Sequence, residues 1–523
     1  MDYTITTRNL VWIIGTFVLF LMVMARAVSE PKQVDLSILT RMIFPVICGF
    51  FVVTLFSLTQ AINFGEGIYE ALRTFGMVVF LFVATIIISE NNPNVLLKFI
   101  ILLAFGLVIY GMYQYFAIPI NPAKRIGTMA NMNLCSSGHL LLMPFSVYAV
   151  FKYSKPWKLI GAISVLMALF IIFFSLRTRS TWVALFVMVI VATLHKRKLI
   201  VIALISIVVL GIAVYSFKGK KVLNTASIKQ RGDLWSQSLN MVKDNPMGVG
   251  VGNWRIVIPF YARNMSKTTR DVAFRTIYFQ RPHNDWMWVL TEMGIVGIIL
   301  YVTFFGLGLY YAIKARSVLM YSCLAAYMVF AVFSFPKERA FHSIYMLLVM
   351  AFSISLYHKT KPIKLNRKAI YLVSVFVLAI LSVTIVDFSY RYITERNSLK
   401  VMRSRQAKDW ATVLRQTEDI SMFSTLDSAC TPFLYYQAVS NFILKDFKRA
   451  LRDSQEAIKE SPYHLGNLML FSKCLIMSQR FQEARECYEN ILQIYPGHKE
   501  AAKDLEFLKK LPTKVVSKKG SVK

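Results

Sequence analysis

Apolar blocks long enough to cross a membrane recur through the first three quarters of the sequence. A helix of about 20 predominantly apolar residues spans a hydrocarbon core roughly 30 Å thick, so each block predicts one membrane-spanning helix. The chain has 523 residues, of which 56% are hydrophobic, and it is therefore expected to be a polytopic, all-α membrane protein. About twelve spans are expected, near residues 10–28, 42–62, 71–89, 98–117, 134–151, 158–176, 180–195, 199–217, 286–313, 318–335, 341–357 and 369–388.

The basic residues of the short loops predict how these spans are oriented. Lysine and arginine crowd the loops at residues 152–158, 196–198 and 359–368. Cytoplasmic loops carry such an excess, and the expected spans place all three loops on one side, so this side is predicted to be cytoplasmic. The N-terminus and the loops at 118–133, 177–180, 218–285 and 336–340 are expected on the opposite, external side, together with everything after residue 388.

The long loop at residues 218–285 is basic although it is expected on the external side. It holds twelve lysine and arginine residues against four acidic ones. External loops are normally poor in basic residues, so an anionic ligand at the membrane surface, such as a lipid-linked diphosphate, explains this charge better than topology does. A solvated charged surface remains the alternative. The net charge of +32 is accompanied by no nucleic-acid-binding motif, and no nucleic-acid partner is expected.

The last quarter of the chain carries an internal repeat. The segments DFKRALRDSQEAIKESP and RFQEARECYENILQIYP place Phe447 and Phe481, and likewise Pro462 and Pro496, 34 residues apart. This period, with a small residue three positions after the aromatic one, is typical of tetratricopeptide repeats. We expect a membrane domain over residues 1–390, a soluble repeat domain over 395–510 with a degenerate copy from Asp409, and a basic, disordered tail at 511–523. Such repeats bind peptides or partner proteins, and a stabilising cap on the membrane domain is a close alternative.

Polar clusters at the external ends of the spans indicate where chemistry is expected. The clusters are RIGTMANMN at 125–133, SLRTRSTW at 175–182, the segment at 231–254, and PHNDW at 282–286. Arginine near hydrocarbon is costly unless it faces a polar cavity or an anion. Bidentate guanidinium groups stabilise a developing phosphate charge without a metal, and a neutral imidazole can accept a proton from a hydroxyl. Arg179, Arg231 and His283 are therefore the predicted catalytic residues.

Several other chemistries lack their motifs. The sequence has no HExxH, GxSxG or Walker pattern and no external DxD pair, so neither a metal nor a cofactor is expected. For each arginine, snorkelling to the membrane interface is the alternative explanation. For the cluster around His283, the alternative is interfacial anchoring by Trp286 and Trp288.

In these segments the chain resembles the O-antigen ligase superfamily, which includes O-antigen polymerases and bacterial protein O-oligosaccharyltransferases. TRSTWVAL resembles the family's Ser-Arg motif at the start of a helix, with Arg179 at the arginine position and Thr178 in place of serine. RGDLW followed by DNPMGVGVGNW resembles the family's external-loop pattern of Arg, Trp and a Pro-x-Gly-x-Gly turn. PHNDWMWVLTEMGIVG resembles the His-Asn motif followed by Glu-x-Gly-x-x-Gly, carried here by His283, Asn284, Glu292, Gly294 and Gly297.

The resemblance implies a GT-C-like helical bundle in the bacterial inner membrane, with the site and the repeat domain facing the periplasm. It implies metal-independent, inverting transfer of a preassembled glycan from undecaprenyl diphosphate to an acceptor hydroxyl, with no cofactor. Arginines would bind the diphosphate, and His283 would activate the acceptor, with Asn284 and Asp285 orienting the imidazole. The further substrate-binding candidates are Arg177, Arg255, Asn284, Arg281, Lys337 and Arg339.

The acceptor stays open between a protein, a lipid A-core and a growing polysaccharide, so ligation and polymerisation are both compatible with these motifs. The repeat domain slightly favours a protein acceptor or partner. A lipid-linked glycan transporter is the alternative from another class. It predicts charges in the middle of several spans, whereas this sequence keeps nearly all its charges at the span ends, as Asp387 illustrates.

Overall fold

A computed structural model of the chain describes residues 5–29, 36–118, 124–129, 131–193, 225–275, 279–357, 367–418, 420 and 423–510. All regular secondary structure in these residues is helical, apart from an isolated bridge between Leu426 and Pro432, so the all-α prediction is confirmed. The expected span at 199–217, the basic loops at 196–198 and 359–366 and the tail at 511–523 lie outside the described residues.

Within the described residues, eight helical segments are long and apolar enough to cross a membrane. They are α1 (Ile5–Ser29), α2 (Ile43–Ser57) with the 3-10 helix η2 (Leu58–Gln60), α3 (Phe64–Glu90), α4 (Pro93–Ala117), α5 (Met132–Lys152), α6 (Trp157–Phe170) with the π-helix η4 (Ile171–Leu176), α12 (Asp285–Lys314) and α15 (Arg367–Gln406). Three shorter apolar helices are α7 (Arg179–Thr193), α13 (Val318–Phe333) and α14 (Ala340–Leu356). Together these segments coincide with eleven of the expected spans. The chain is therefore a multi-pass membrane protein.

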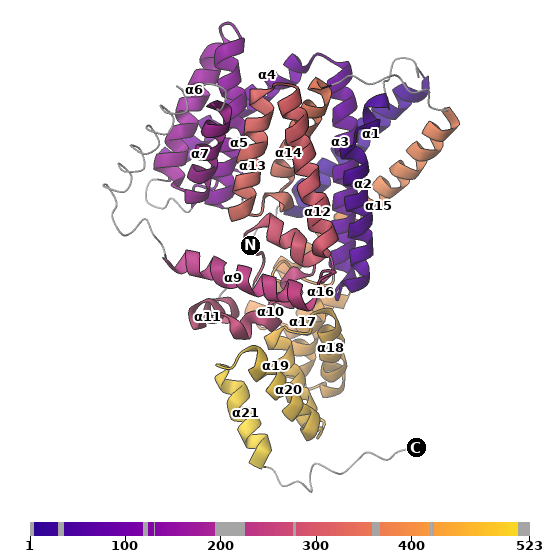
Figure 1. The fold of residues 1–523 in the computed structure, drawn as a ribbon. Coiled ribbons are helices and arrows are strands. Elements are labelled where there is room, and N and C mark those ends of the chain that lie inside the picture. Colours follow the sequence, from indigo (N-terminus) through magenta and orange to yellow (C-terminus); the bar gives the residue numbers. More distant parts are fainter. Residues whose placement is uncertain are drawn as a thin grey trace.

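Contacts between helices far apart in the sequence hold the bundle together (Figure 1). α1 packs against α3 and α15, α3 against α14, α2 against α12, and α7 against α13. α4, α5 and α6 pack on one another, and α5 also packs on α13. α3 and α5 are buried around most of their circumference, whereas α15 exposes most of its apolar surface, as expected of a helix that faces lipid.

Two spans are longer than the apolar pattern predicts. α3 begins at Phe64 rather than near residue 71, because Asn63 caps it by accepting a hydrogen bond from Glu66 N at 3.0 Å. α15 continues to Gln406 rather than ending near residue 388, because its polar end packs against α16 through Val401 and Val413. The expected boundary at 390–395 lies within this continuous helix, and the domain limits stay a prediction.

The described residues after α15 form six helices, each of which packs against the next. They are α16 (Trp410–Glu418), α17 (Phe433–Ile443), α18 (Phe447–Glu460), α19 (Leu465–Met477), α20 (Phe481–Ile494) and α21 (Lys499–Lys510). Ala450 and Ala484 occupy equivalent positions of the 34-residue repeat, and both are fully buried. Small side chains at these two positions therefore let neighbouring helices approach closely and share one core.

Three helices of the long loop lie between the membrane bundle and the C-terminal helices (Figure 1). They are α9 (Thr225–Asp244), α10 (Trp254–Tyr261) and α11 (Lys267–Arg275). Phe260 packs against Tyr463, and Phe274 packs against Tyr495, with ring centroids 5.2 Å apart in both pairs. The Tyr495 hydroxyl also donates to Asp271 Oδ1 at 2.9 Å. The C-terminal helices therefore support the loop directly, as a stabilising cap would.

Candidate functional site

His283 lies in a tight turn directly before α12. Its backbone φ of +56° is a left-handed conformation that histidine adopts more readily than most residues other than glycine. Asn284 then caps the helix, because its side-chain oxygen accepts a hydrogen bond from the first helical turn at 3.0 Å. The indole N–H of Trp235 donates to the carbonyl of Pro282 at 2.9 Å, and the imidazole packs edge-on against Phe335 with ring centroids 5.1 Å apart. Contacts from α9, α12 and the segment before η7 (Pro336–Glu338) therefore hold the turn in place.

Arg231 and Trp235 lie about one turn apart on α9, so both side chains are on the same face of the helix. Because Trp235 contacts the histidine turn, Arg231 is brought close to His283. Arg179, the first residue of α7, lies close to Arg231 in turn. Burial lowers the pKa of Arg231, and the positive charge of Arg179 lowers it further. The structure thus brings together the three predicted catalytic residues from three distant segments.

The imidazole of His283 is partly buried and lies among positive charges. Burial lowers its pKa from 6.5 to about 4, Arg231 and Arg281 act in the same direction, and Glu338 opposes them. The ring is therefore neutral near pH 7 and has one unprotonated nitrogen that can accept a proton.

The two residues expected to orient the imidazole have other partners. The side chain of Asn284 caps α12, and Asp285 Oδ2 accepts a hydrogen bond from Lys337 N at 2.8 Å. Asp285 thereby joins the start of α12 to η7, beside the turn. Both residues shape the turn that carries His283 instead of bonding to its ring.

Glu338 of η7 pairs with two of the further candidates, Arg281 and Arg339. Arg281 Nε donates to both carboxylate oxygens, at 2.7 and 2.6 Å, and Arg339 Nη2 lies 3.2 Å from the same group. Burial alone would raise the pKa of Glu338, but the two guanidiniums outweigh it and hold the pKa below its ordinary value. Both guanidiniums also lie over the ring of Phe335, which His283 contacts.

Glu66, near the start of α3, neutralises Arg255 in the same way. Arg391 of α15 shares this carboxylate, with its Nη1 3.0 and 3.1 Å from the two oxygens. Lys337 is the last of the paired candidates, and its Nζ lies 4.0 Å from Glu292 Oε2. Each of these cations therefore has a carboxylate partner, although Glu66 and Glu338 are each shared by two arginines.

Arg179 and Arg231 differ from these cations, because neither has a carboxylate partner in the described part of the chain. Arg177 differs again, although it is close to Arg179 in sequence. It ends η4 with φ +54°, is exposed, and donates from Nε to the carbonyl of Phe174 at 2.9 Å. The structure therefore favours Arg179 over Arg177 as a ligand for an anion.

The Pro-x-Gly-x-Gly turn of the long loop packs directly against a kink in α12. Gly294 interrupts that helix with φ +66°, and carbonyl groups just before it accept hydrogen bonds from Val249 N and Gly250 N at 3.0 and 3.1 Å. Gly248 has φ +93°, and a Cβ atom on either Gly248 or Gly294 would overlap the backbone of the opposite segment. The two glycine motifs therefore form one interlocked unit, which fixes α9 and its arginine relative to the histidine turn.

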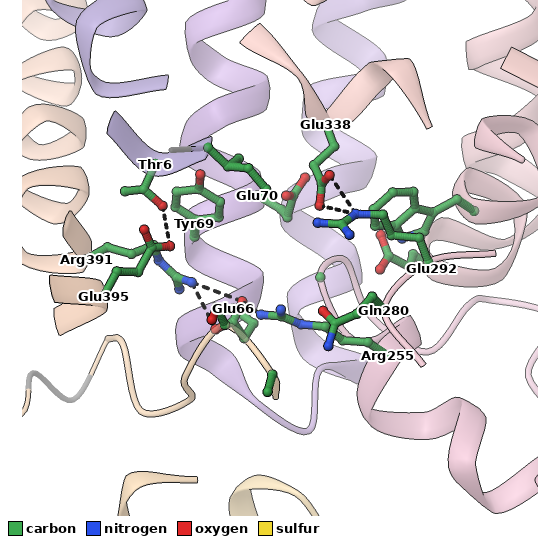
Figure 2. Close-up of a pocket in the computed structure, with 16 residues that line it drawn as sticks. Thr6, Glu66, Tyr69, Glu70, Arg255, Gln280, Glu292, Glu338, Arg391 and Glu395 are labelled. Atoms are coloured by element: carbon green, nitrogen blue, oxygen red, sulfur yellow. Dashed lines mark hydrogen bonds and ion pairs between the residues drawn. The ribbon is translucent and has the colours of Figure 1, made fainter. Parts of the chain in front are cut away.

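A cavity of about 620 Å³ lies beside the histidine turn. Gln280 and Arg281 line it from the segment that leads to His283, and Ser428 and Ala429 line it from the segment before α17. Figure 2 shows one acidic side chain of its lining, Glu66, between two arginines. The cavity is lined by five glutamates in all, namely Glu66, Glu70, Glu292, Glu338 and Glu395.

Of these five glutamates, only Glu292 belongs to a motif recognised in the sequence, and the other four were not predicted. They are scattered carboxylates at the ends of apolar blocks, and Glu66 is separated from its partner Arg391 by 325 positions. No local motif links such residues. The one available signal was the acidic residues themselves, because a carboxylate beside an apolar span is costly unless it is paired.

Two parts of the chain match models of known protein families. A family model described as O-Antigen ligase matches residues 162–302. This segment of the chain is similar to the O-antigen ligases. The ligase match runs from α6 into α12 and includes Arg179, Arg231 and His283. A tetratricopeptide-repeat model matches residues 442–506, so the resemblance to the O-antigen ligase superfamily and the C-terminal repeats are both confirmed. No match was found among curated proteins.

Proposed function

We propose that the protein transfers a preassembled glycan from undecaprenyl diphosphate to an acceptor hydroxyl on the periplasmic face of the bacterial inner membrane. The family match supports a membrane glycosyltransferase of the ligase or polymerase type. The observation that carries the proposal is the pair Arg179 and Arg231, which lie close together near His283 without a carboxylate partner among the described residues. Two such guanidiniums repel each other unless an anion neutralises them, and a diphosphate does so through paired hydrogen bonds.

The proposed reaction is a displacement at the anomeric carbon of the donor glycan. The acceptor oxygen forms a bond to this carbon, while the bond from the carbon to the diphosphate oxygen breaks. The electron pair of the broken bond remains on the diphosphate, and Arg179 and Arg231 stabilise its additional negative charge. Attack from the face opposite the diphosphate inverts the anomeric configuration. The hydroxyl proton passes to the unprotonated nitrogen of His283.

His283 has the protonation state that this role requires. Burial and the neighbouring arginines lower its pKa to about 4, so the neutral imidazole predominates at neutral pH. A base of low pKa is weak, and it therefore accepts the proton as the bond to the diphosphate breaks and the acceptor oxygen becomes acidic. The diphosphate already leaves as a stabilised anion, so the proposal includes no metal ion.

The proposed orientation rests on the arrangement of the loops. The helices α9, α10 and α11 and the repeat domain gather at one end of the bundle, and the loop between α5 and α6 lies at the opposite end (Figure 1). The histidine turn contacts α9 through Trp235 and therefore lies at the first of these ends. This second loop carries the lysines at 152–158, which mark a cytoplasmic side. The site end would then face the periplasm. Ligation and polymerisation share this orientation and the transfer step, and they differ in the acceptor.

Binding of a polyprenyl diphosphate to the purified full-length protein, in EDTA, tests the proposal. Arg179→Ala and Arg231→Ala should each weaken binding by about tenfold or more, because each removes charge-assisted hydrogen bonds. The matched control is Lys229→Ala, which removes an exposed positive charge from the opposite side of α9. It should bind within about twofold of the wild type. Equal binding by all four proteins would show that the two arginines do not hold the donor.

A further inference from the structure

Four lysines gather at one end of the membrane bundle, near the start of α4 and where α5 leads into α6. They are Lys98, Lys152, Lys155 and Lys158. Between Glu90 and Asp233 the sequence contains no acidic residue, and the carboxylate of Glu90 lies 3.8 Å from Arg26 Nη1 instead. Within the residues that the structure describes, none of the four lysines forms an ion pair with a carboxylate. This four-lysine cluster therefore carries an unbalanced positive charge.

Two aromatic rings hold Lys98 of α4 over the loop between α5 and α6. Its Nζ lies 5.6 Å from the ring centroid of Tyr153 and 5.3 Å from that of Trp157. The Tyr153 hydroxyl also donates to Asn94 Oδ1 at 2.8 Å, one turn before Lys98. Aromatic faces attract an ammonium group without accepting all three of its N–H donors, so Lys98 can still donate to an anion. The orientation of the spans requires basic residues in a loop, but it does not require this arrangement of a lysine from another helix.

The neighbouring apolar side chains place the four-lysine cluster at the depth of the lipid headgroups. Phe99 follows Lys98 directly, Phe151 lies at the end of α5, and Leu159 lies at the start of α6. All three side chains are more than half exposed. Apolar side chains this exposed on a membrane bundle contact acyl chains, and the lysines beside them extend toward the headgroups.

We propose that the four-lysine cluster binds the headgroup of an anionic glycerophospholipid, whose acyl chains lie along α4 and α6. The phosphodiester oxygens accept hydrogen bonds from Lys98 and from the lysines of the loop. A zwitterionic lipid brings a cation of its own, which the same lysines repel. The site lies at the end of the bundle opposite α9 and the repeat domain (Figure 1), so it is independent of the proposed transfer reaction. In the proposed orientation it faces the cytoplasmic leaflet.

Native mass spectrometry of the full-length protein, freed of co-purified lipid, tests the proposal. Phosphatidylglycerol and cardiolipin are titrated against phosphatidylcholine with matched acyl chains, and glycerol phosphate supplies a headgroup without chains. The wild type should bind both anionic lipids at least about tenfold more tightly than phosphatidylcholine, and it should bind glycerol phosphate far more weakly. Lys98→Gln should weaken the binding of anionic lipid by about fivefold. Lys98→Arg should bind like the wild type, because it keeps the positive charge.

Lys314→Gln is the matched control. Lys314, at the end of α12, is an exposed lysine whose Nζ lies 5.6 Å from the centroid of one ring, that of Tyr310. This variant should bind anionic lipid within about twofold of the wild type. A melting temperature of Lys98→Gln equal to that of the wild type, without added lipid, would show that lost binding is not lost folding.

Three results would overturn the proposal. The first is equal affinity of the wild type for anionic lipids and phosphatidylcholine. The second is an equal effect of Lys98→Gln and Lys314→Gln on lipid binding, and the third is binding of glycerol phosphate as tight as that of the lipids. None of these results bears on transfer, which is tested separately by binding of the polyprenyl diphosphate.

Discussion

At the scale of single residues, His283 combines a strained backbone with a well-supported turn. A non-glycine residue with φ near +56° is less stable by about 1–3 kcal/mol than one in an ordinary conformation. Trp235 bonds to the carbonyl before His283, and Asn284 caps the helix after it. Such a conformation persists only where the surrounding contacts hold it, and these two contacts do so here.

The pKa of His283 predicts the acid limb of the pH profile for glycan transfer. Because the pKa is lowered from 6.5 to about 4, the imidazole stays neutral as the pH falls through 6.5 and is protonated only as it approaches 4. The value of kcat/KM for the wild type should therefore be constant down to about pH 5 and fall below that. His283→Gln should lower kcat by about 10²–10⁴-fold at neutral pH.

The lowered pKa of His283 also makes the stability of the folded protein depend on pH. A group whose pKa is lower in the folded than in the unfolded protein contributes stability that is complete above pH 6.5 and is lost as the pH falls toward 4. The activity measurement therefore needs circular dichroism at each pH to exclude unfolding. With the protein folded throughout, an acid limb centred near pH 6.5 would contradict the environment described for the imidazole.

The identity of the central residues was predictable at this scale, but the ion pairs of the surrounding arginines were not. Arg179, Arg231 and His283 follow from motif order and from a common side of the membrane. The pairs that neutralise Arg255 and Arg281 join segments separated by 189 and 57 positions, and no periodicity connects them. Sequence reasoning therefore placed Arg255 and Arg281 among the substrate-binding candidates, whereas the structure pairs both with carboxylates.

At the scale of elements, the interlocked glycine turns make Gly294 a position of α12 that does not tolerate a side chain. Alanine there would keep the positive φ and place its Cβ against the carbonyl of Pro246. We expect Gly294→Ala to lower the free energy of unfolding by about 1–3 kcal/mol and to reduce transfer, because α9 and α12 would separate. The melting temperature Tm in detergent, with transfer activity measured alongside, checks this expectation.

Gly306→Ala provides the control on the same helix. No atom lies within 4 Å of the position that its Cβ would occupy, and its backbone is helical. This variant should be as stable as the wild type or more stable by about 0.5–1 kcal/mol, since alanine restricts the unfolded chain. Equal Tm values for the two variants would show that the kink does not depend on glycine.

The apolar pattern predicted the existence of the helices better than their ends. Eleven expected spans coincide with described helices, because burial and lipid exposure both require long apolar runs. The start of α3 and the extension of α15 depended on polar partners from elsewhere. Glu66 is stabilised in α3 by Arg255 and Arg391, and the end of α15 is covered by α16. Such partners leave no trace in a local hydropathy pattern.

At the scale of the whole molecule, the repeat domain supports the loop that carries Arg231. Tyr495 is buried, packs against Phe274 and donates to Asp271, both on α11. Ser266 and Thr269 in turn donate to Asp233 of α9. Tyr495→Ala should therefore loosen α10 and α11 and raise hydrogen–deuterium exchange over residues 254–275, with a local loss of about 3–5 kcal/mol.

Phe507→Ala is the matched control for this interface, because Phe507 is an aromatic residue of the repeat domain that is 62% exposed. Hydrogen–deuterium exchange over residues 254–275 should be the same in this variant as in the wild type, and its rate of glycan transfer should be unchanged. If Tyr495→Ala also left exchange over the loop unaltered, the repeat domain would not stabilise the loop. The motif period predicted the repeats themselves, whereas their position against the loop depends on aromatic contacts between distant segments.

Transfer of a glycan by the purified protein tests the central claim most directly. The reaction contains an undecaprenyl-diphosphate oligosaccharide, EDTA and a choice of acceptors, namely lipid A-core, a serine- and threonine-rich protein, or the donor alone. We predict an inverted product with the wild type and with Lys229→Ala, and a loss of at least about 100-fold with Arg179→Ala, Arg231→Ala and His283→Ala. No product with any acceptor, from a donor that a known transferase can use, would contradict the account and favour a lipid-linked glycan transporter.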